Sequence, residues 1–381
     1  MFAPAEVEPA AEFGAAVAVG DDLTIVGSPL RDGVAEDTGS VVIFDNSATG
    51  GARTELQSAL AADGDRFGTA IALDGERFAV GAPLADSPLS NAGSVSIFEP
   101  NDDGDYNETI ITAADGAIND RFGTAIALDG DRLAVAATGA DDNGAQSGAV
   151  HVYDRNDDGE WEVVTKLTPT DGAEGDRFGT ALTLVGDIVI VGAPNADVGD
   201  QADAGKVYVF EQTGDGVWEE TQLAASTPQA EGGFGASVAA DNARIAIGAG
   251  GDVDSETSGS AYVFDRSTTD DPSWAETELE PNLPEGAALR DFGTAVAMTG
   301  DRVVVGAPDD DDNNGAIFVF DQTIDGNWVP TRQAAPDDGA GSFGQSVALN
   351  PADGSIAVGA PNVNRSGSPR SGIAFRLADI P

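Results

Sequence analysis

The sequence predicts an all-β fold, a seven-bladed β-propeller whose blades are four-stranded antiparallel sheets. Phe-Gly recurs seven times, at intervals of 51 to 58 residues. Repeats of about this length are typical of propellers, solenoids and arrays. Each repeat also contains short apolar runs bounded by turn residues, which favours strands over helices. The repeats begin near Phe13, Phe67, Phe122, Phe178, Phe234, Phe292 and Phe343.

The order of strands is clearest in the fourth repeat. Its first run follows Phe178, its second ends at Pro194, its third is KVYVFE, and its fourth begins at Trp218. The first connection is a two-residue turn in most repeats, such as Asp74-Gly75 or Asp129-Gly130, which is typical of a tight β-hairpin. A second turn precedes the Trp-bearing run. Strands one and two, and strands three and four, are therefore predicted to pair antiparallel.

Residue size places the strands relative to the axis. Strand one carries small residues such as Thr69, Ala70 and Ala72, which fit the narrow centre of a propeller. The Trp-bearing fourth strand is then outermost, where the four Trp side chains are expected to pack the outer strands. Strand two is apolar throughout, as in 303–305, because sheets cover both of its faces.

Residues 1–381 are predicted to form one domain, because each repeat buries its faces only against its neighbours. The last repeat ends after GIAFRLADIP and lacks a fourth strand. Phe2 lies eleven residues before Phe13, as Leu56 and Ile111 lie eleven residues before the following Phe-Gly. Residues 1–8 are therefore predicted to be the closing strand of blade seven, which would remove two exposed sheet edges.

Acidic residues dominate the charge of the chain. It has 66 Asp and Glu against 18 Lys and Arg, a net charge of −48. Such a surface repels itself in dilute buffer, whereas molar salt screens the repulsion. We interpret the acidity as adaptation to brine in a halophilic organism; an acidic solubilising surface is the alternative. The field disfavours nucleic acid and anionic membranes as partners and favours cations and cationic or neutral ligands.

Targeting signals are lacking in the sequence. There is no cysteine, no apolar stretch of the length that a membrane span needs, and no signal-peptide pattern at the start. These observations predict no membrane insertion by this chain. They leave a mature or trimmed domain and an intracellular protein as alternatives. We expect a monomer.

Gly-Ala-Pro follows the second strand in four repeats, at 81–83, 192–194, 306–308 and 359–361. Near matches stand at 27–29 and 248–250, while 136–138 is Ala-Ala-Thr. With Phe-Gly, these motifs resemble the FG-GAP repeat family, which includes the integrin α-subunit head and prokaryotic, haloarchaeal-type proteins. The resemblance covers essentially the whole chain. It implies a seven-bladed propeller and extracellular binding or adhesion, without naming a ligand.

Acidic loops follow the second strands and are expected on the same face as the segments before Phe-Gly. Their carboxylates would surround the axial mouth and bind a cation, a polyhydroxyl group or a basic group. The alternative is a set of solvated loops. The candidate ligand-binding residues are Asp141, Asp142, Asp197, Asp200, Asp203, Asp252, Asp254, Asp309, Asp310, Asp311 and Asp312.

One segment carries the spacing of a calcium loop. The family's calcium loop lies between strands one and two, where this chain has only short Asp-Gly turns. Asp154, Asn156, Asp158 and Glu162 instead read D-x-N-x-D-G-x-x-E between strands three and four. Alternate oxygen ligands around a Gly suit Ca²⁺, which we take as the candidate cofactor. An ordinary Asp-Gly hairpin is the alternative.

No motif in the sequence indicates an established catalytic centre. It has no Ser-His-Asp arrangement, zinc spacing or phosphate loop, and His151 occupies a strand position that holds Tyr208 in the next repeat. The leading hypothesis is a non-enzymatic ligand-binding or adhesion module at the cell surface or outside the cell, with a protein or glycan ligand. A carboxylate- or cation-dependent hydrolase or lyase at the axial mouth, and a structural subunit, are the alternatives. A location in the cytoplasm of an organism that accumulates salt is a further alternative.

Overall fold

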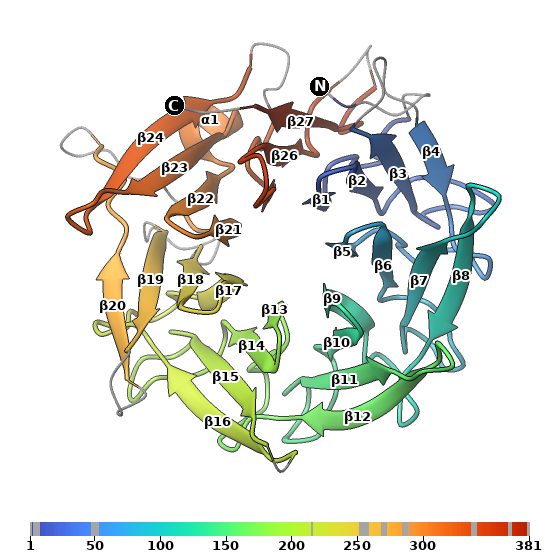
Figure 1. The fold of residues 1–381 in the computed structure, drawn as a ribbon, viewed down its shortest axis with the longest axis horizontal. Coiled ribbons are helices and arrows are strands. Elements are labelled where there is room, and N and C mark those ends of the chain that lie inside the picture. Colours follow the sequence, from blue (N-terminus) through green and yellow to red (C-terminus); the bar gives the residue numbers. More distant parts are fainter. Residues whose placement is uncertain are drawn as a thin grey trace.

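The computed structural model describes residues 2, 8–46, 53–214, 216–250, 259–267, 273–283, 289, 291–336, 341–364 and 368–378. Over these residues seven sheets stand around a central axis, as the sequence predicts (Figure 1). The described part of the chain contains one short helix, α1 (Asp310–Asn313). No helix there is long and apolar enough to cross a lipid bilayer.

Six blades have four strands, and their bounds follow the repeats. Blade 1 contains β1 (Val17–Val19), β2 (Leu23–Ser28), β3 (Ser40–Asp45) and β4 (Arg53–Leu56); blade 2 contains β5 (Ala70–Asp74), β6 (Arg77–Ala82), β7 (Ser94–Pro100) and β8 (Tyr106–Ile111); blade 3 contains β9 (Phe122–Asp129), β10 (Arg132–Ala137), β11 (Ala149–Arg155) and β12 (Trp161–Leu167). Blade 4 contains β13 (Ala181–Val185), β14 (Ile188–Ala193), β15 (Lys206–Gln212) and β16 (Trp218–Leu223); blade 5 contains β17 (Phe234–Ala240), β18 (Arg244–Ala249), β19 (Ser260–Arg266) and β20 (Trp274–Glu278); blade 6 contains β21 (Val296–Thr299), β22 (Arg302–Ala307), β23 (Ala316–Gln322) and β24 (Trp328–Ala334). Blade 7 contains β25 (Ser346–Leu349), β26 (Ile356–Ala360) and β27 (Ile373–Leu377).

Strands within each blade pair in chain order and antiparallel. In blade 4, Val185 pairs with Ile188 across the two-residue turn that joins β13 to β14. The first strand of each blade lies at the axis and the fourth at the rim (Figure 1). The predicted placement of small residues inside and Trp-bearing strands outside is therefore confirmed.

The Phe of each Phe-Gly is part of the core. All seven of these side chains are at most 2% exposed. In blade 4, Phe178 packs edge-to-face on Tyr208 and Phe210, with ring centroids 5.5 and 5.9 Å apart. Burying a side chain of this size contributes about 1.5–3 kcal/mol relative to leaving it exposed. The repeated Phe is thus a packing residue and not a binding residue.

The two glycine motifs form the two halves of one contact between blades. A Cβ at Gly192, in Gly-Ala-Pro of blade 4, would overlap the carbonyl oxygen of Gly235, in Phe-Gly of blade 5. Only glycine allows two backbones to approach this closely. The other pairs of this kind are Gly27 with Gly68, Gly81 with Gly123, Gly248 with Gly293, Gly306 with Gly344, and Gly359 with Gly14. In blade 3, Ala136 takes this place beside Gly179.

Phe2 closes the ring at the predicted position. Its backbone N–H donates to the carbonyl oxygen of Ala374 at 2.6 Å, and the N–H of Ala374 donates back at 3.3 Å. The Phe2 ring also packs on Phe44 of blade 1, with centroids 4.5 Å apart. Phe2 therefore pairs with β27 and joins blades 7 and 1. Residues 1 and 3–7 of the predicted closing strand lie outside the described residues.

Candidate functional site

The two ends of the strands form two different faces. The hairpin face carries the turns that join strand one to strand two and strand three to strand four. The loop face carries the segments before Phe-Gly and the segments after Gly-Ala-Pro. Because the strands of a blade alternate in direction, each repeat contributes the same parts to each face.

Arginines on the hairpin face connect neighbouring blades. Arg132, at the start of β10, donates two hydrogen bonds to Asp154 of its own blade, at 2.7 and 2.9 Å. Its Nη1 donates to Asp187 of blade 4 at 2.7 Å. The guanidinium lies over the Trp218 ring of blade 4, 5.6 Å from its centroid. One side chain thus holds blades 3 and 4 together by ion pairing and a cation–π contact.

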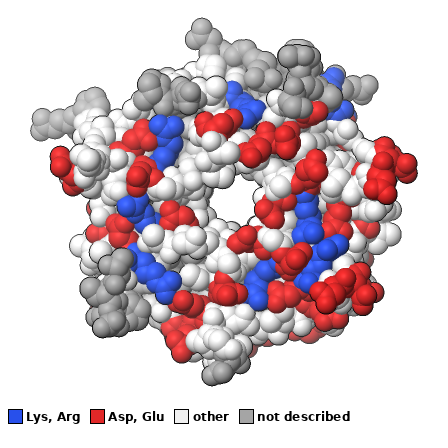
Figure 2. Space-filling model, viewed as in Figure 1, with Lys and Arg blue, Asp and Glu red and all other residues white. Residues whose placement is uncertain are grey.

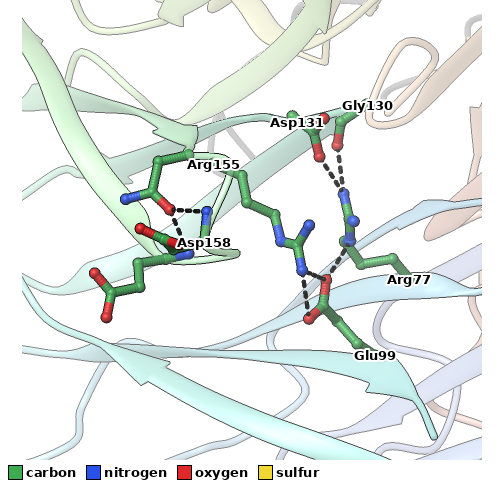
Figure 3. A network of polar contacts seen from close by, with 8 residues as sticks. Arg77, Glu99, Gly130, Asp131, Arg155 and Asp158 are labelled. Atoms are coloured by element: carbon green, nitrogen blue, oxygen red, sulfur yellow. Dashed lines mark hydrogen bonds and ion pairs between the residues drawn. The ribbon is translucent and has the colours of Figure 1, made fainter.

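The same arrangement recurs in other blades. Arg77 binds Glu99 at 2.8 Å in its own blade and Asp131 at 3.2 Å in the next, and Arg155 of the next blade also binds Glu99 (Figure 3). Arg77, Arg244 and Arg266 lie over Trp161, Trp328 and Trp274, respectively. In Figure 2, Lys and Arg lie in a circle around the axial opening, beside Asp or Glu. The four Trp residues therefore serve packing, as expected.

The residues of the predicted calcium loop are already used by the protein. The Asp154 carboxylate is paired with Arg132. Asn156 Oδ1 accepts the N–H groups of Asp158 and Glu160 at 3.0 and 2.9 Å, and its Nδ2 donates to Glu162 at 2.9 Å. Among the described residues, no group of three or more His, Asp or Glu is placed to hold a metal ion. A Ca²⁺ ion in this loop would have to displace these contacts, and Ca²⁺ binding stays a prediction from the spacing.

Several acidic loop residues accept hydrogen bonds from the backbone of their own loops. Asp141 Oδ1 accepts the N–H of Gln146 at 2.8 Å, and Asp197 Oδ1 accepts the N–H of Asp203 at 3.1 Å. Each N–H belongs to a residue with a positive φ, so the carboxylate stabilises a left-handed backbone position. Of the remaining candidates, Asp142 pairs with Lys166 and Asp310 pairs with Arg332. Asp200 and Asp309 are exposed. Asp252, Asp254 and the side chains of Asp311 and Asp312 lie outside the described residues.

Two neighbouring cavities open on the loop face at blades 3 and 4. The larger, about 510 Å³, we name the arginine cavity; Arg121, Thr138 and Arg177 are among its lining residues. The smaller, about 370 Å³, we name the acidic cavity; Asp171 and Asp176 are among its lining residues. Arg177 and Gln146 line both cavities and so form the wall between them. Asp141 lines the first, while Asp197 and Asp203 line the second.

Three arginines of the repeated Asp-Arg-Phe-Gly segment differ from the arginines of the hairpin face. Arg66, Arg121 and Arg177 are exposed, and none has an ion pair within the described part of the chain. All other described Lys and Arg side chains take part in an ion pair or another polar contact. Sequence reasoning concentrated on the acids and missed these residues. The sequence did contain a signal for them: arginine, which is scarce in this chain, recurs directly before Phe-Gly in three repeats.

The lost Gly-Ala-Pro motif of blade 3 changes the arginine cavity. Thr138 stands where five of the other six blades have Pro, and its hydroxyl lies 3.3 Å from the hydroxyl of Thr124. Thr124 Oγ1 donates to the carbonyl oxygen of Arg121 at 2.6 Å. The corresponding prolines are Pro29, Pro83, Pro194, Pro308 and Pro361. Blade 3 therefore has a hydroxyl, on a side chain that is 8% exposed, at a position where those blades are apolar.

Carboxylates of the acidic cavity have pKa values displaced in opposite directions. Burial opposes ionisation of Asp171, but hydrogen bonds from Lys206 at 2.7 Å and Tyr208 at 2.8 Å leave its pKa below the usual range. Burial raises the pKa of Asp176, although its Oδ2 accepts the N–H of Ala173 at 2.8 Å. The cavity thus combines groups with different proton affinities.

His151 is a buried strand residue, as the sequence predicts. It lies in β11 and packs edge-to-face on Phe122, with ring centroids 5.5 Å apart. Its Nε2 is 3.9 Å from Asp115 Oδ1, which favours protonation. Burial outweighs that attraction and lowers the pKa of His151.

Comparisons with known proteins agree with the repeat structure. Residues 56–98, 107–153, 161–210, 218–264 and 283–320 match the family model described as FG-GAP repeat, and together they cover more than half of the chain. The first four matches run from the fourth strand of one blade to the third strand of the next. No curated protein matches the chain. On the strength of these repeats, the chain belongs to the FG-GAP repeat family.

Proposed function

We propose that the protein is a non-enzymatic binding or adhesion module whose ligand contacts the loop face at the arginine cavity. The observation that carries the proposal is the exposure of Arg121 and Arg177, without ion pairs, in a chain of net charge −48. The FG-GAP propeller supports a binding or adhesion role in general. We further propose a monomer at the cell surface or outside the cell of a halophilic organism.

Unpaired guanidinium groups are available to a ligand. A guanidinium has five N–H donors in a fixed planar arrangement, and it stays charged at all ordinary pH values. On the hairpin face these donors bind Asp and Glu of the protein itself, and Trp rings cover the guanidinium groups. At the arginine cavity they remain free for a protein or glycan ligand. Cation binding by the acidic loops is a separate part of the proposal.

A hydrolase is the second candidate, and one observation favours it. Asp171 and Asp176 line one cavity with pKa values displaced in opposite directions, a feature of acid–base enzymes. However, Asp65 and Asp120 accept the same loop N–H bond as Asp176, at the same position of blades 2 and 3. This recurrence favours a structural role for the buried carboxylate, so binding is the better supported function.

The test is a binding screen with a blocked cavity. Glycan and peptide arrays are probed in about 2 M KCl, where electrostatic repulsion is screened. Ala145→Trp places a bulky, uncharged side chain at an exposed position of the arginine cavity. Val217→Trp, at an exposed position of the hairpin between β15 and β16, is the matched control. We expect the first variant to lose the ligand and the second to keep it.

Equal ligand binding by the wild type and Ala145→Trp would refute the arginine cavity as the binding site. Conversion of the captured ligand to a product would replace the binding proposal by the hydrolase. Repeating the screen with added Ca²⁺ and with a chelator tests whether Ca²⁺, the candidate cofactor, affects ligand binding.

A further inference from the structure

Two guanidinium groups from different blades line the arginine cavity. Arg121 precedes β9 and Arg177 precedes β13, so the two side chains approach the cavity from its two walls. Planar N–H pairs of arginine match the two oxygens of a carboxylate, and such charge-assisted hydrogen bonds are about twice as strong as neutral ones. The chemistry of these two residues therefore favours a ligand that carries a carboxylate.

The rest of the lining is suited to hydroxyl groups. Asn119 Oδ1 accepts a hydrogen bond from Asn91 at 2.9 Å, which leaves the Asn119 Nδ2 donors without a partner in the described structure. The Gln146 side-chain amide also makes no hydrogen bond within the described residues. Thr138 adds a hydroxyl that the Pro-bearing blades lack. Amides and hydroxyls of this kind bind the hydroxyl groups of a sugar.

Charge and size limit the number of acidic groups on the ligand. The chain carries −48, and Asp141 also lines the cavity, so a strongly charged polyanion is repelled. A volume of about 510 Å³ lies in the range of small-molecule sites. Ile118 is the one large apolar side chain of the lining, which offers little to the apolar anchors of a peptide. A short saccharide with few carboxylates meets all three conditions.

We infer that the arginine cavity binds a carboxylated saccharide, of the uronic-acid class. Arg121 and Arg177 bind the carboxylate, while Asn119, Gln146 and Thr138 bind ring hydroxyl groups. The inference rests on the proposed function, because it names the ligand class of that same cavity. No bond is made or broken in this complex.

The test is calorimetric titration with digalacturonic acid in about 2 M KCl. The wild type is compared with Arg121→Gln and Arg177→Gln, which keep a polar side chain but remove the charge. Arg66→Gln is the matched control, because Arg66 has the same motif and exposure in blade 2 but does not line the cavity. We expect each cavity variant to bind at least about tenfold more weakly, corresponding to about 1.4 kcal/mol, and the control to bind as the wild type does.

Two further ligands identify the chemical class. The methyl ester of digalacturonic acid keeps the sugar and removes the charge, so its binding should fall to the level of the Arg177→Gln variant. Hexaglutamate offers carboxylates without a sugar and should bind more weakly than digalacturonic acid. Unchanged circular dichroism and melting establish that the variants are folded, which we expect for exposed side chains without ion pairs.

Equal binding of acid and ester, preference for hexaglutamate, or no effect of either cavity substitution would each overturn the inference. These outcomes differ from failure of the proposed function. If the arrays yield a neutral ligand that Ala145→Trp excludes, the cavity is a binding site but its ligand class is wrong. If Ala145→Trp excludes no ligand, the proposed function itself fails.

Discussion

The hairpin face and the loop face hold adjacent blades together by different means. On the hairpin face, ion pairs such as Arg132 with Asp154 and Asp187 cross from blade to blade, and Trp218 covers the guanidinium. On the loop face, neighbouring blades meet through their backbones, as where Gly192 of blade 4 touches Gly235 of blade 5. The difference teaches that a repeat can use its arginine for structure at one end of its strands, as with Arg132, and leave another arginine without an ion pair at the other end, as with Arg177.

The largest expected effect comes from a methyl group at the loop-face contact. Gly192→Ala places a Cβ into the backbone carbonyl of Gly235, so blades 4 and 5 must move apart. We expect a loss of about 3 kcal/mol in the free energy of unfolding, at the upper end of the range for overpacking. Thermal or denaturant unfolding in high salt measures it.

Ala136→Gly is the control for this substitution. Ala136 occupies the corresponding position of blade 3, which has already adjusted to a Cβ beside Gly179. Removing one methyl group there should cost less than about 1 kcal/mol. Similar losses for both variants would show that glycine is not required by the contact between blades.

The second effect concerns the hairpin face. Arg132→Ala removes both ion pairs and the contact with Trp218, and we expect a loss of about 2 kcal/mol. The loss stays below that for a fully buried pair, because the side chains of Asp154 and Asp187 are 41% and 71% exposed and become hydrated. The stability of Arg132→Lys should lie between those of the wild type and Arg132→Ala, since lysine keeps the charge but cannot make the bidentate bond.

Arg132→Ala also tests whether the two faces act independently. Arg132→Ala should bind the loop-face ligand with wild-type affinity in the titrations described above. A lower affinity at unchanged folding would mean that the two faces are not independent, and the division of roles between them would be wrong.

The smallest effect is a pH dependence near the loop face. Burial lowers the pKa of His151, although Asp115, Asp142 and Asp120 oppose this effect; Lys166 reinforces it. The unfolded chain, with a His pKa near about 6.5, takes up a proton before the folded protein does. Stability is therefore fully present above that pH and declines as the pH falls below it toward the folded pKa.

His151→Tyr removes this contribution and copies Tyr208 of blade 4, whose hydroxyl donates to Asp171. Melting temperatures of the wild type and the variant, measured from pH about 7.5 to about 5.5, should diverge on the acidic side. A constant difference between the two proteins over this range would show that His151 does not titrate differently on folding.

The fold was largely predictable because the same sequence motif, Phe-Gly, recurs in every blade. Phe178 and its six equivalents fix the register, and the eleven-residue spacing identified Phe2 as a closing residue without any knowledge of contacts. Strand order followed from tight turns such as Asp129-Gly130 and from residue size. Each of these inferences needed only local chemistry and the period.

The candidate site was predictable only in part. The spacing at Asp154 and Asn156 suits calcium, but spacing does not reveal that Arg132 and the turn N–H groups use the same oxygens. Asp141 and Asp197 were expected to face a ligand, and they accept hydrogen bonds from their own loops. Which polar groups are already paired depends on three-dimensional neighbours, and so Arg177 gained its significance only from the structure.

The backbone contact between Gly-Ala-Pro and Phe-Gly has a consequence for how such a ring diversifies. In each contact, Gly-Ala-Pro or its counterpart belongs to one repeat and Phe-Gly to the repeat that follows. Every repeat therefore carries one of each, and a whole repeat can be exchanged as a unit. Loops such as 138–147 start next to this fixed junction and end at the next strand. Ligand choice can therefore be transplanted from one blade to another while the joints of the ring stay the same.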